Sequence, residues 1–282
     1  MRDTRLRFIQ GGLGEEPREF KDLKDFILRK NIETSYYKTA TNILEEILFM
    51  LEQVPNVLET LLLLRYETKK TSLDELINEY TAKSQTGRII ITGHSLGGLH
   101  GRSYAQRHPE KVSKCITIAT PHYGTPAAPF GKMLKPLGVE TSSIKQMYIN
   151  STLTKKLNED LKTRREEFRR RGTSFVNIWG KLDLFAPYPH SKLEDPDKEY
   201  DLNNHGHVSI VNSEETAKIL EYEVKETWEK TGKPCPVVLL HGFCLNEKTF
   251  NRLLGRLKIN CNDIATKTYT VNYDYTKEII SV

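Results

Sequence analysis

The sequence predicts an α/β fold in which helices flank a mostly parallel sheet. Short apolar runs of strand length occur at 89–92, 114–119, 174–179 and 236–243, and segments of helical character lie between them. Connections of this kind are right-handed crossovers, which bring successive strands into one parallel sheet. Further strands are expected at 198–202 and 268–273, and further helices at 72–83, 214–230 with Ser213 as N-cap, and 247–258.

A strand-to-helix turn at residues 93–97 carries the strongest functional signal. The apolar run 89–92 meets the pentapeptide GHSLG, and a helical segment follows it. A G-x-S-x-G turn in this context raises the serine hydroxyl clear of the strand, because glycine on both sides leaves room for the sharp bend. Ser95 is therefore predicted to be a nucleophile, with Gly93 and Gly97 supporting the turn. A glycine-rich connection with an incidental serine is the competing interpretation.

Composition limits the classes of protein to which this chain can belong. The 282 residues carry a net charge of +5, from 42 Lys and Arg against 37 Asp and Glu, and this balance does not favour a nucleic-acid partner. Cys115, Cys235, Cys244 and Cys261 have no metal-binding spacing, so free thiols are expected. No stretch approaches the roughly 20 apolar residues of a membrane span, and the first residues lack the apolar core of a signal peptide. We therefore expect a cytoplasmic location.

Six segments together resemble the bacterial-type lipases and esterases of the α/β-hydrolase fold. In chain order they are GHSLGG, ATPHYGTP, SSIKQMYINSTLTKKLN, GKLDLFAP, NHGHVSIV and PVVLLHGF. The resemblance implies an α/β-hydrolase fold and ester hydrolysis that needs no cofactor and no metal ion. In that family the His-Gly strand precedes the serine turn, whereas here it follows at 236–243. The strand order is therefore predicted to be circularly permuted. The competing interpretation is a tandem or swapped array, in which the tail begins a second copy.

The domain organisation follows from the same comparison of segments. Residues 1–70 match nothing in the family and are expected to form a helical extension of unknown role, and 71–282 form the hydrolase domain. For the extension we expect a helix pair packed on the core, with a lid or lipid-facing surface as the alternative. Within the domain, 127–172 is a helical insertion where the family carries a cap, and 234–282 supplies the permuted His-Gly strand, a helix and a final strand.

The charged run at 162–171 lies at the end of this insertion. Basic residues lie on both sides of Glu166 and Glu167, which predicts a solvated helix face with ion pairs between residues i and i+4. Attraction to an anionic lipid surface is the alternative, and it would make the protein a peripheral membrane partner.

A serine hydroxyl needs a base and an orienting carboxylate before it can act as a nucleophile at neutral pH. Asp183 follows the strand 174–179 at its carboxyl end, where such sheets bind ligands, and it is predicted to be the acid. A turn or helix-cap aspartate is the alternative. Two histidines, His205 and His207, are candidates for the base, and the resemblance to the family's G-H-V-S segment selects His207. His94 is expected only to pack.

Negative charge develops on the carbonyl oxygen during acyl transfer, and two N–H donors are needed to stabilise it. The Leu96 amide is expected to be one of them. The resemblance assigns the other to Phe243, which follows the supporting His241-Gly242 turn. The sequence thus predicts a serine hydrolase of carboxylic esters, with a lipid or other small ester of an apolar acyl group as substrate. An acyltransferase with the same residues and a non-catalytic binding protein of the same fold are the alternatives.

Overall fold

The computed structural model describes residues 72–126, 145–243, 245, 247–271, 273 and 279–280. All of them belong to Thr41–Val282, the second of the two units into which the chain divides. The extension predicted for 1–70, and residues 127–144 of the predicted insertion, lie outside the described residues.

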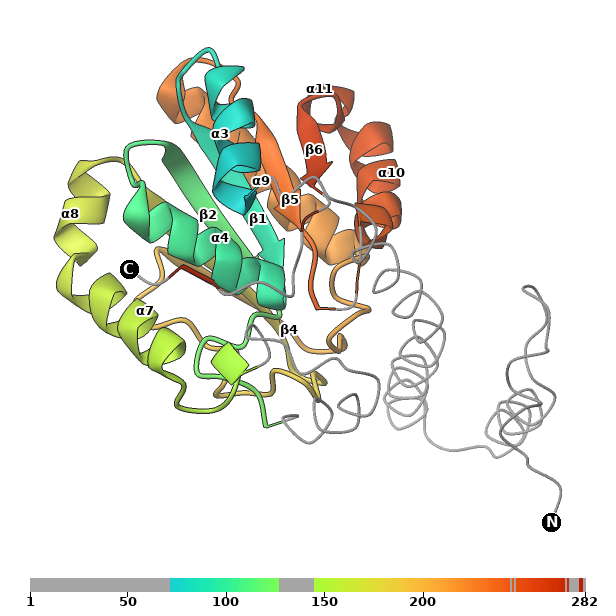
Figure 1. Ribbon diagram of the computed structural model, residues 1–282. Coiled ribbons are helices and arrows are strands. Elements are labelled where there is room, and N and C mark those ends of the chain that lie inside the picture. The colour runs from blue at the N-terminus through green and yellow to red at the C-terminus, as the bar shows by residue number, and fades with distance from the viewer. Residues whose placement is uncertain are drawn as a thin grey trace, which may run out of the picture. The chain divides into compact units, whose positions relative to one another are not determined.

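Six parallel strands form one sheet in the order β4-β3-β2-β1-β5-β6 (Figure 1). Every residue of β1, β2 and β5 is buried, as expected for the inner strands of a parallel sheet that is covered on both faces. These buried strands are the continuous apolar runs of the sequence, and the predicted α/β fold is confirmed. The strands are β1 (Ile89–His94), β2 (Val112–Ile118), β3 (Ser174–Gly180), β4 (Lys198–Leu202), β5 (Val237–Leu240) and β6 (Thr268–Val271).

Helices cover both faces of the sheet, and each face has its own apolar core. Side chains alternate between the faces, so Ile89 and Ile91 enter one core and Ile90 the other. Figure 1 shows α3, α4 and α7 on one side of the sheet and α9 on the other. The first core includes α3 (Leu73–Ala82), α4 (Leu96–Arg107), α7 (Thr152–Thr163) and α8 (Arg165–Arg170). The second includes α9 (Glu214–Thr231), α10 (Asn251–Asn260), which the short 3-10 helix η2 (Glu247–Phe250) precedes, and α11 (Asn262–Ala265).

The tail of the chain supplies a strand in the interior of the sheet. β5 lies between β1 and β6, with Ile90 opposite Val237 and Gly93 opposite Leu240. The connection from α9 begins at Gly232, whose φ of 70° ends that helix in the left-handed conformation. The His-Gly strand thus lies directly beside the strand that leads to Ser95. The strand order is consistent with circular permutation, and the permutation itself stays a prediction.

Residues 152–170, which belong to the predicted insertion 127–172, form two helices that pack on the first core. Leu153, Leu157 and Leu161 of α7 lie in the first core, and Phe168 of α8 packs against Phe175 of β3 with ring centroids 5.4 Å apart. The leucines recur every four residues, which places them on one face of the helix. These two helices therefore bury one face against the sheet, between β2 and β3 in chain order.

The charged run 162–171 forms the predicted ion pairs and two that the sequence does not predict. Arg164 pairs with Asp160 at 3.1 Å, four residues before it. Arg165 instead turns inward, where its nearly buried guanidinium lies 2.6 Å from Asp197 and 3.2 Å from Asp195. The buried pairing attaches α8 to the segment that leads into β4.

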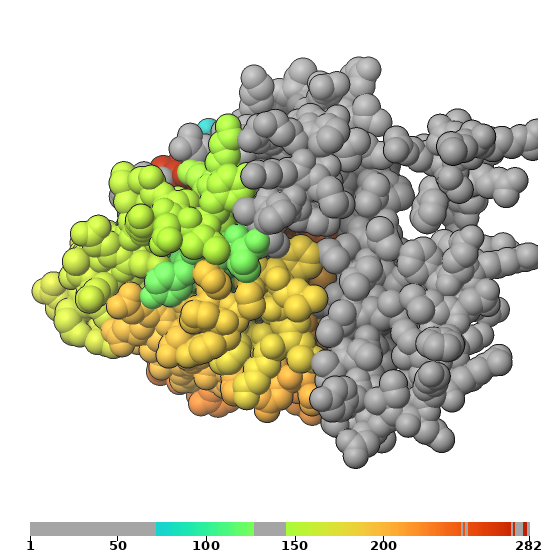
Figure 2. Space-filling model, turned by 90° about the horizontal axis from the view of Figure 1, so that it is seen from below, coloured from blue at the N-terminus to red at the C-terminus, as the bar shows by residue number. Residues whose placement is uncertain are grey.

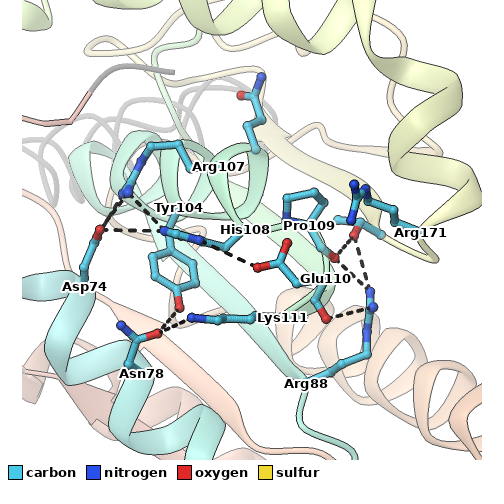
Figure 3. Close-up of polar contacts among 12 residues, drawn as sticks. Asp74, Asn78, Arg88, Tyr104, Arg107, His108, Pro109, Glu110, Lys111 and Arg171 are labelled. Carbon is cyan, nitrogen blue, oxygen red and sulfur yellow. Dashed lines mark hydrogen bonds and ion pairs between the residues drawn. The ribbon is translucent and has the colours of Figure 1, made fainter.

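Polar contacts attach α3 to α4 and to Lys111, which directly precedes β2 (Figure 3). Arg107 donates two hydrogen bonds to the carboxylate of Asp74, at 2.7 and 2.9 Å. The hydroxyl of Tyr104 and the ammonium of Lys111 both donate to Oδ1 of Asn78, at 2.8 and 3.0 Å.

None of the helices in the described part of the chain is long and apolar enough to cross a bilayer.

Candidate active site

Ser95 occupies the turn between β1 and α4 in a backbone conformation that residues other than glycine rarely adopt. Its φ is 53° and its ψ is −122°, and its N–H donates to the carbonyl of Ile118 at 2.9 Å. A Cβ atom on Gly93 would lie 2.5 Å from the carbonyl carbon of Gly97, so the turn closes only with glycine at position 93. Strained conformations of this kind persist where the surrounding structure holds them, and they are frequent at active sites.

A continuous hydrogen-bonded chain links Ser95, His207 and Asp183. Oγ of Ser95 is 2.9 Å from Nε2 of His207, and Nδ1 of His207 is 2.8 Å from Oδ2 of Asp183. All three residues are at most 9% exposed. The distances fit a neutral imidazole that donates from Nδ1 to the carboxylate and accepts from the serine hydroxyl at Nε2. The structure therefore brings together the three side chains that the sequence singles out.

Backbone amides fix the orientation of the Asp183 carboxylate. Its Oδ1 accepts from the N–H groups of Phe185 and Ala186 at 2.8 and 2.7 Å, while Oδ2 faces His207. Asp183 is therefore a turn aspartate as well as the partner of the histidine. The two interpretations of the sequence are compatible, because each uses a different oxygen.

The other candidate base, His205, lies outside this chain of hydrogen bonds. Its Nε2 is 3.4 Å from the carboxylate of Glu215, at the start of α9. Of the two neighbouring histidines, it is thus His207 whose ring faces Ser95.

The His-Gly turn of the tail lies directly against the serine turn. A Cβ atom on Gly242 would be 3.0 Å from Cβ of Ser95. The carbonyl of His241 accepts from the Tyr273 hydroxyl at 2.6 Å, and the two rings stack with centroids 4.5 Å apart. These contacts hold the turn that leads into Phe243, whose side chain is half-buried against the first core.

Leu96 is the first residue of α4, so its N–H is one of the four that a helix leaves without an internal acceptor. It follows Ser95 directly, at the positive end of the helix dipole. The two backbone positions expected to stabilise an oxyanion, Leu96 and Phe243, thus come from turns that meet at Ser95.

His94 has a contact that the sequence does not predict. Its Nε2 is 2.7 Å from the main-chain carbonyl of His207, and the two rings are 4.9 Å apart. Burial lowers the pKa of His94 well below its usual range, and the neighbouring His207 adds to this, so the ring is neutral. The one sequence signal for this contact is the position of His94 next to Ser95, because the contact depends on how a loop from much later in the chain folds.

The loops that follow the strands form one continuous surface at the site's edge of the sheet. Figure 2 shows the segment after β2, in green, between residues of the 145–163 region and of the loops after β3. The N–H of Tyr123 donates to the carbonyl of His190 at 3.1 Å, which joins two of these loops. Four large apolar side chains on these loops are exposed: Tyr123, Ile149, Leu184 and Tyr188.

The described cysteines are not arranged for catalysis or metal binding. Cys115, Cys235 and Cys261 are free thiols, as predicted, and burial raises the pKa of Cys115 to about 12 and of Cys235 to about 11. Within the described ranges, no group of three or more His, Cys, Asp or Glu side chains is placed to hold a metal ion. Cys244 lies outside the described residues.

The alpha/beta hydrolase fold family matches the chain over residues 64–171, which include Ser95. Together with the parallel sheet and the serine turn after β1, this match shows that the chain has the α/β-hydrolase fold. A search of the curated proteins gives no match.

Two solved structures are among those similar to the chain. A monoacylglycerol lipase of Paleococcus ferrophilus is 16% identical, with 56% of this chain and 76% of that chain covered and a TM-score of 0.35. A structure from work on carboxylesterases of the ammonia-oxidizing thaumarchaeon Nitrososphaera gargenis is also 16% identical, with 58% and 75% covered and a TM-score of 0.37.

Proposed function

We propose that this protein is a serine hydrolase that cleaves carboxylic esters through a covalent acyl-enzyme. The observation that carries the proposal is the hydrogen-bonded chain from Ser95 through His207 to Asp183, with its two distances of 2.9 and 2.8 Å. A nucleophile, a base within reach of its proton and a group that orients the base are the parts that this chemistry requires.

In the acylation step, Oγ of Ser95 bonds to the ester carbonyl carbon while its proton passes to Nε2 of His207. The electron pair of the carbonyl moves onto its oxygen, where the N–H groups of Leu96 and Phe243 stabilise the negative charge. Losing one such donor costs about 3 kcal/mol of transition-state stabilisation. The ester C–O bond then breaks, and the departing alcohol takes the proton from His207.

Deacylation repeats these movements with water in place of serine. Water gives a proton to His207 as its oxygen bonds to the acyl carbon, and Ser95 leaves with that proton when the bond to its oxygen breaks. In both steps, the Asp183 carboxylate stabilises the imidazolium that forms on His207. Its hydrogen bonds to the backbone hold the carboxylate in position for this.

We propose esters of lipids or other apolar acyl groups as the substrate class. The apolar side chains on the loops at this edge support it, notably Leu184, which follows Asp183 directly and is 54% exposed. The ring of Phe185 also lies 5.1 Å from that of His207. A series of p-nitrophenyl esters tests this: kcat/KM should rise from acetate to longer acyl chains. A monotonic fall with chain length would contradict the apolar substrate but not the hydrolase.

The decisive experiment is labelling with a fluorophosphonate, which bonds covalently to an activated serine. We expect wild-type protein to be labelled at Ser95, and Ser95→Ala to be neither labelled nor active. Ser113→Ala is the matched control, because Ser113 is a buried serine at the start of β2 and its hydroxyl accepts from Arg88. It should be labelled like the wild type. Absence of both labelling and ester hydrolysis in folded wild-type protein would contradict the proposal and favour a binding protein.

A further inference from the structure

His94 and Ser95 are consecutive residues that hold two different parts of His207. Ser95 reaches the ring at Nε2 through its hydroxyl, at 2.9 Å. His94 reaches the main chain, because its own Nε2 lies 2.7 Å from the carbonyl oxygen of His207. Since a carbonyl oxygen can only accept, the Nε2 of His94 must carry the proton and donate it.

The ring of His94 lies between the loop that carries His207 and the His-Gly turn. On one side it contacts the His207 ring, with centroids 4.9 Å apart. On the other side, a Cβ atom on Gly242 would be 3.2 Å from Nδ1 of His94. His94 is 1% exposed, and its Nδ1 has no hydrogen-bond partner among the described residues. Among the described residues, the one hydrogen bond of the His94 side chain is therefore that to the carbonyl of His207.

Packing alone does not require a histidine at this place. A buried polar ring costs free energy unless its polar atoms are bonded, so an apolar side chain of similar size would suit a position that only fills space. The imidazole keeps one nitrogen unbonded and uses the other to hold the backbone of the proposed base. This use of the ring indicates a role in placing His207.

We propose that His94 is a positioning residue, which holds the main-chain carbonyl of His207 and thereby keeps its ring within bonding distance of Ser95. The inference rests on the proposed serine hydrolase. His94 touches neither the substrate nor the reacting atoms, and it acts only through His207. When the backbone of His207 is held at its carbonyl, its side chain can move only by rotation about its own bonds. This limits the positions that Nε2 can take relative to Ser95.

The test compares His94→Leu with His94→Gln, because a glutamine amide can donate to the same carbonyl and leucine cannot. We expect His94→Leu to lower kcat by about 10- to 100-fold, the loss that a misplacement of roughly 1 Å causes. KM should stay within about twofold, because binding of the ester is not affected. His94→Gln should recover most of the lost kcat, and the rates of fluorophosphonate labelling should follow the same order.

His100→Leu and His100→Gln are the matched controls. His100 is also a buried histidine, 7% exposed, but its ring packs edge-on against Tyr273 rather than against His207. The two leucine variants should lose similar amounts of thermal stability, while only His94→Leu loses kcat. Equal kcat in His94→Leu and His94→Gln, or an equal loss in His100→Leu, would overturn the inference.

If His94→Leu does not fold, His94→Gln decides by itself. A kcat within about tenfold of the wild type supports the positioning role, whereas a loss as large as that of His207→Ala overturns it. The proposed function fails separately, when folded wild-type protein is not labelled at Ser95. Normal labelling of the wild type with unchanged His94 variants would overturn only the present inference.

Discussion

A Cβ atom on Gly97 would lie 2.7 Å from the carbonyl carbon of Leu240, so the first turn of α4 and the end of β5 are in backbone contact. This contact joins the serine turn to the tail of the chain. Both turns that meet at Ser95 therefore depend on how closely β5 packs beside β1. The serine turn and the His-Gly turn, which are far apart in the sequence, are thus brought together by the pairing of β1 with β5.

We expect Gly97→Ala to destabilise the protein and to reduce ester hydrolysis. The added methyl group would overlap the main chain of Leu240, which is fixed in the sheet, and overpacking of this kind costs about 1–3 kcal/mol. Urea unfolding gives the change in free energy of unfolding.

Gly255→Ala is the control for that substitution. Gly255 lies within α10, and a Cβ atom there would meet nothing within 4 Å. Alanine should therefore stabilise the protein by about 0.5–1 kcal/mol, because glycine is unfavourable inside a helix. If Gly97→Ala were as stable and active as the wild type, the close approach of the two turns would be refuted.

Local patterns were sufficient to predict most of the fold. The buried strands β1, β2, β3 and β5 contain the main apolar runs of the sequence, because both faces of the sheet are covered. Ser213 caps α9 by accepting from the N–H of Thr216, as its place before the helix predicts. Such signals lie within a few residues of the element they define.

Contacts between distant segments could not be read in the same way. The leucines of α7 have a helical period, but the period does not show which segment the helix packs against. The pairing of Arg165 with Asp195 and Asp197 depends on the path of the chain between β3 and β4. The bond from His94 to His207 likewise exists only once the loop after β4 has folded. Residue type and spacing alone do not predict these contacts between distant segments.

Replacing the two neighbouring histidines should separate their roles in activity. We expect His207→Ala to lower kcat by roughly 10⁴- to 10⁶-fold, because triad members act as a unit and loss of the base removes the combined effect. His205→Ala should stay within about threefold of wild type, because His205 pairs with Glu215 and not with Ser95. Steady-state hydrolysis of a p-nitrophenyl ester, with circular dichroism as a check of folding, measures both. Exchange of the two effects would make His205 the base.

Acid should destabilise the protein through its buried histidines. Burial lowers the pKa of His100 from its usual 6.5 to about 3, and it lowers those of His94 and His122 well below their usual range. The unfolded chain therefore binds protons that the folded chain does not, as the pH falls from 6.5 toward 3. Each such histidine costs up to about 1.4 kcal/mol of unfolding free energy per pH unit in that window.

The variant His100→Leu tests this dependence, because it removes one of these groups. Between pH 6 and pH 4, the slope of unfolding free energy against pH should become shallower by about 1.4 kcal/mol per unit, while Ser113→Ala keeps the wild-type slope. Urea titrations at several pH values supply the slopes. An unchanged slope in His100→Leu would mean that folding does not lower the pKa of His100.

Removal of residues 234–282 should unfold the domain if the tail completes it. β1 would lose β5, its neighbour on one side of the sheet. Both cores would also lose apolar side chains, because the side chains of Val237 to Leu240 are divided between them. The Phe243 amide would be lost as well. We expect the truncated chain to be insoluble or unfolded, and the full chain to be an active monomer by size-exclusion chromatography with light scattering.

A milder cut makes the same prediction testable when the truncated chain cannot be recovered. Lys233 and Pro234 are exposed in the connection between α9 and β5, so a protease site inserted there should be cleaved in the folded protein. If the tail pairs with its own chain, the two fragments should remain together in a one-to-one complex that still hydrolyses esters, because the sheet and both cores hold them. Separation in denaturant should abolish activity, and joint refolding should restore it. A full chain that is active only as a dimer would support the swapped array, and a truncated chain that is stable and active would show that the tail is not part of the domain.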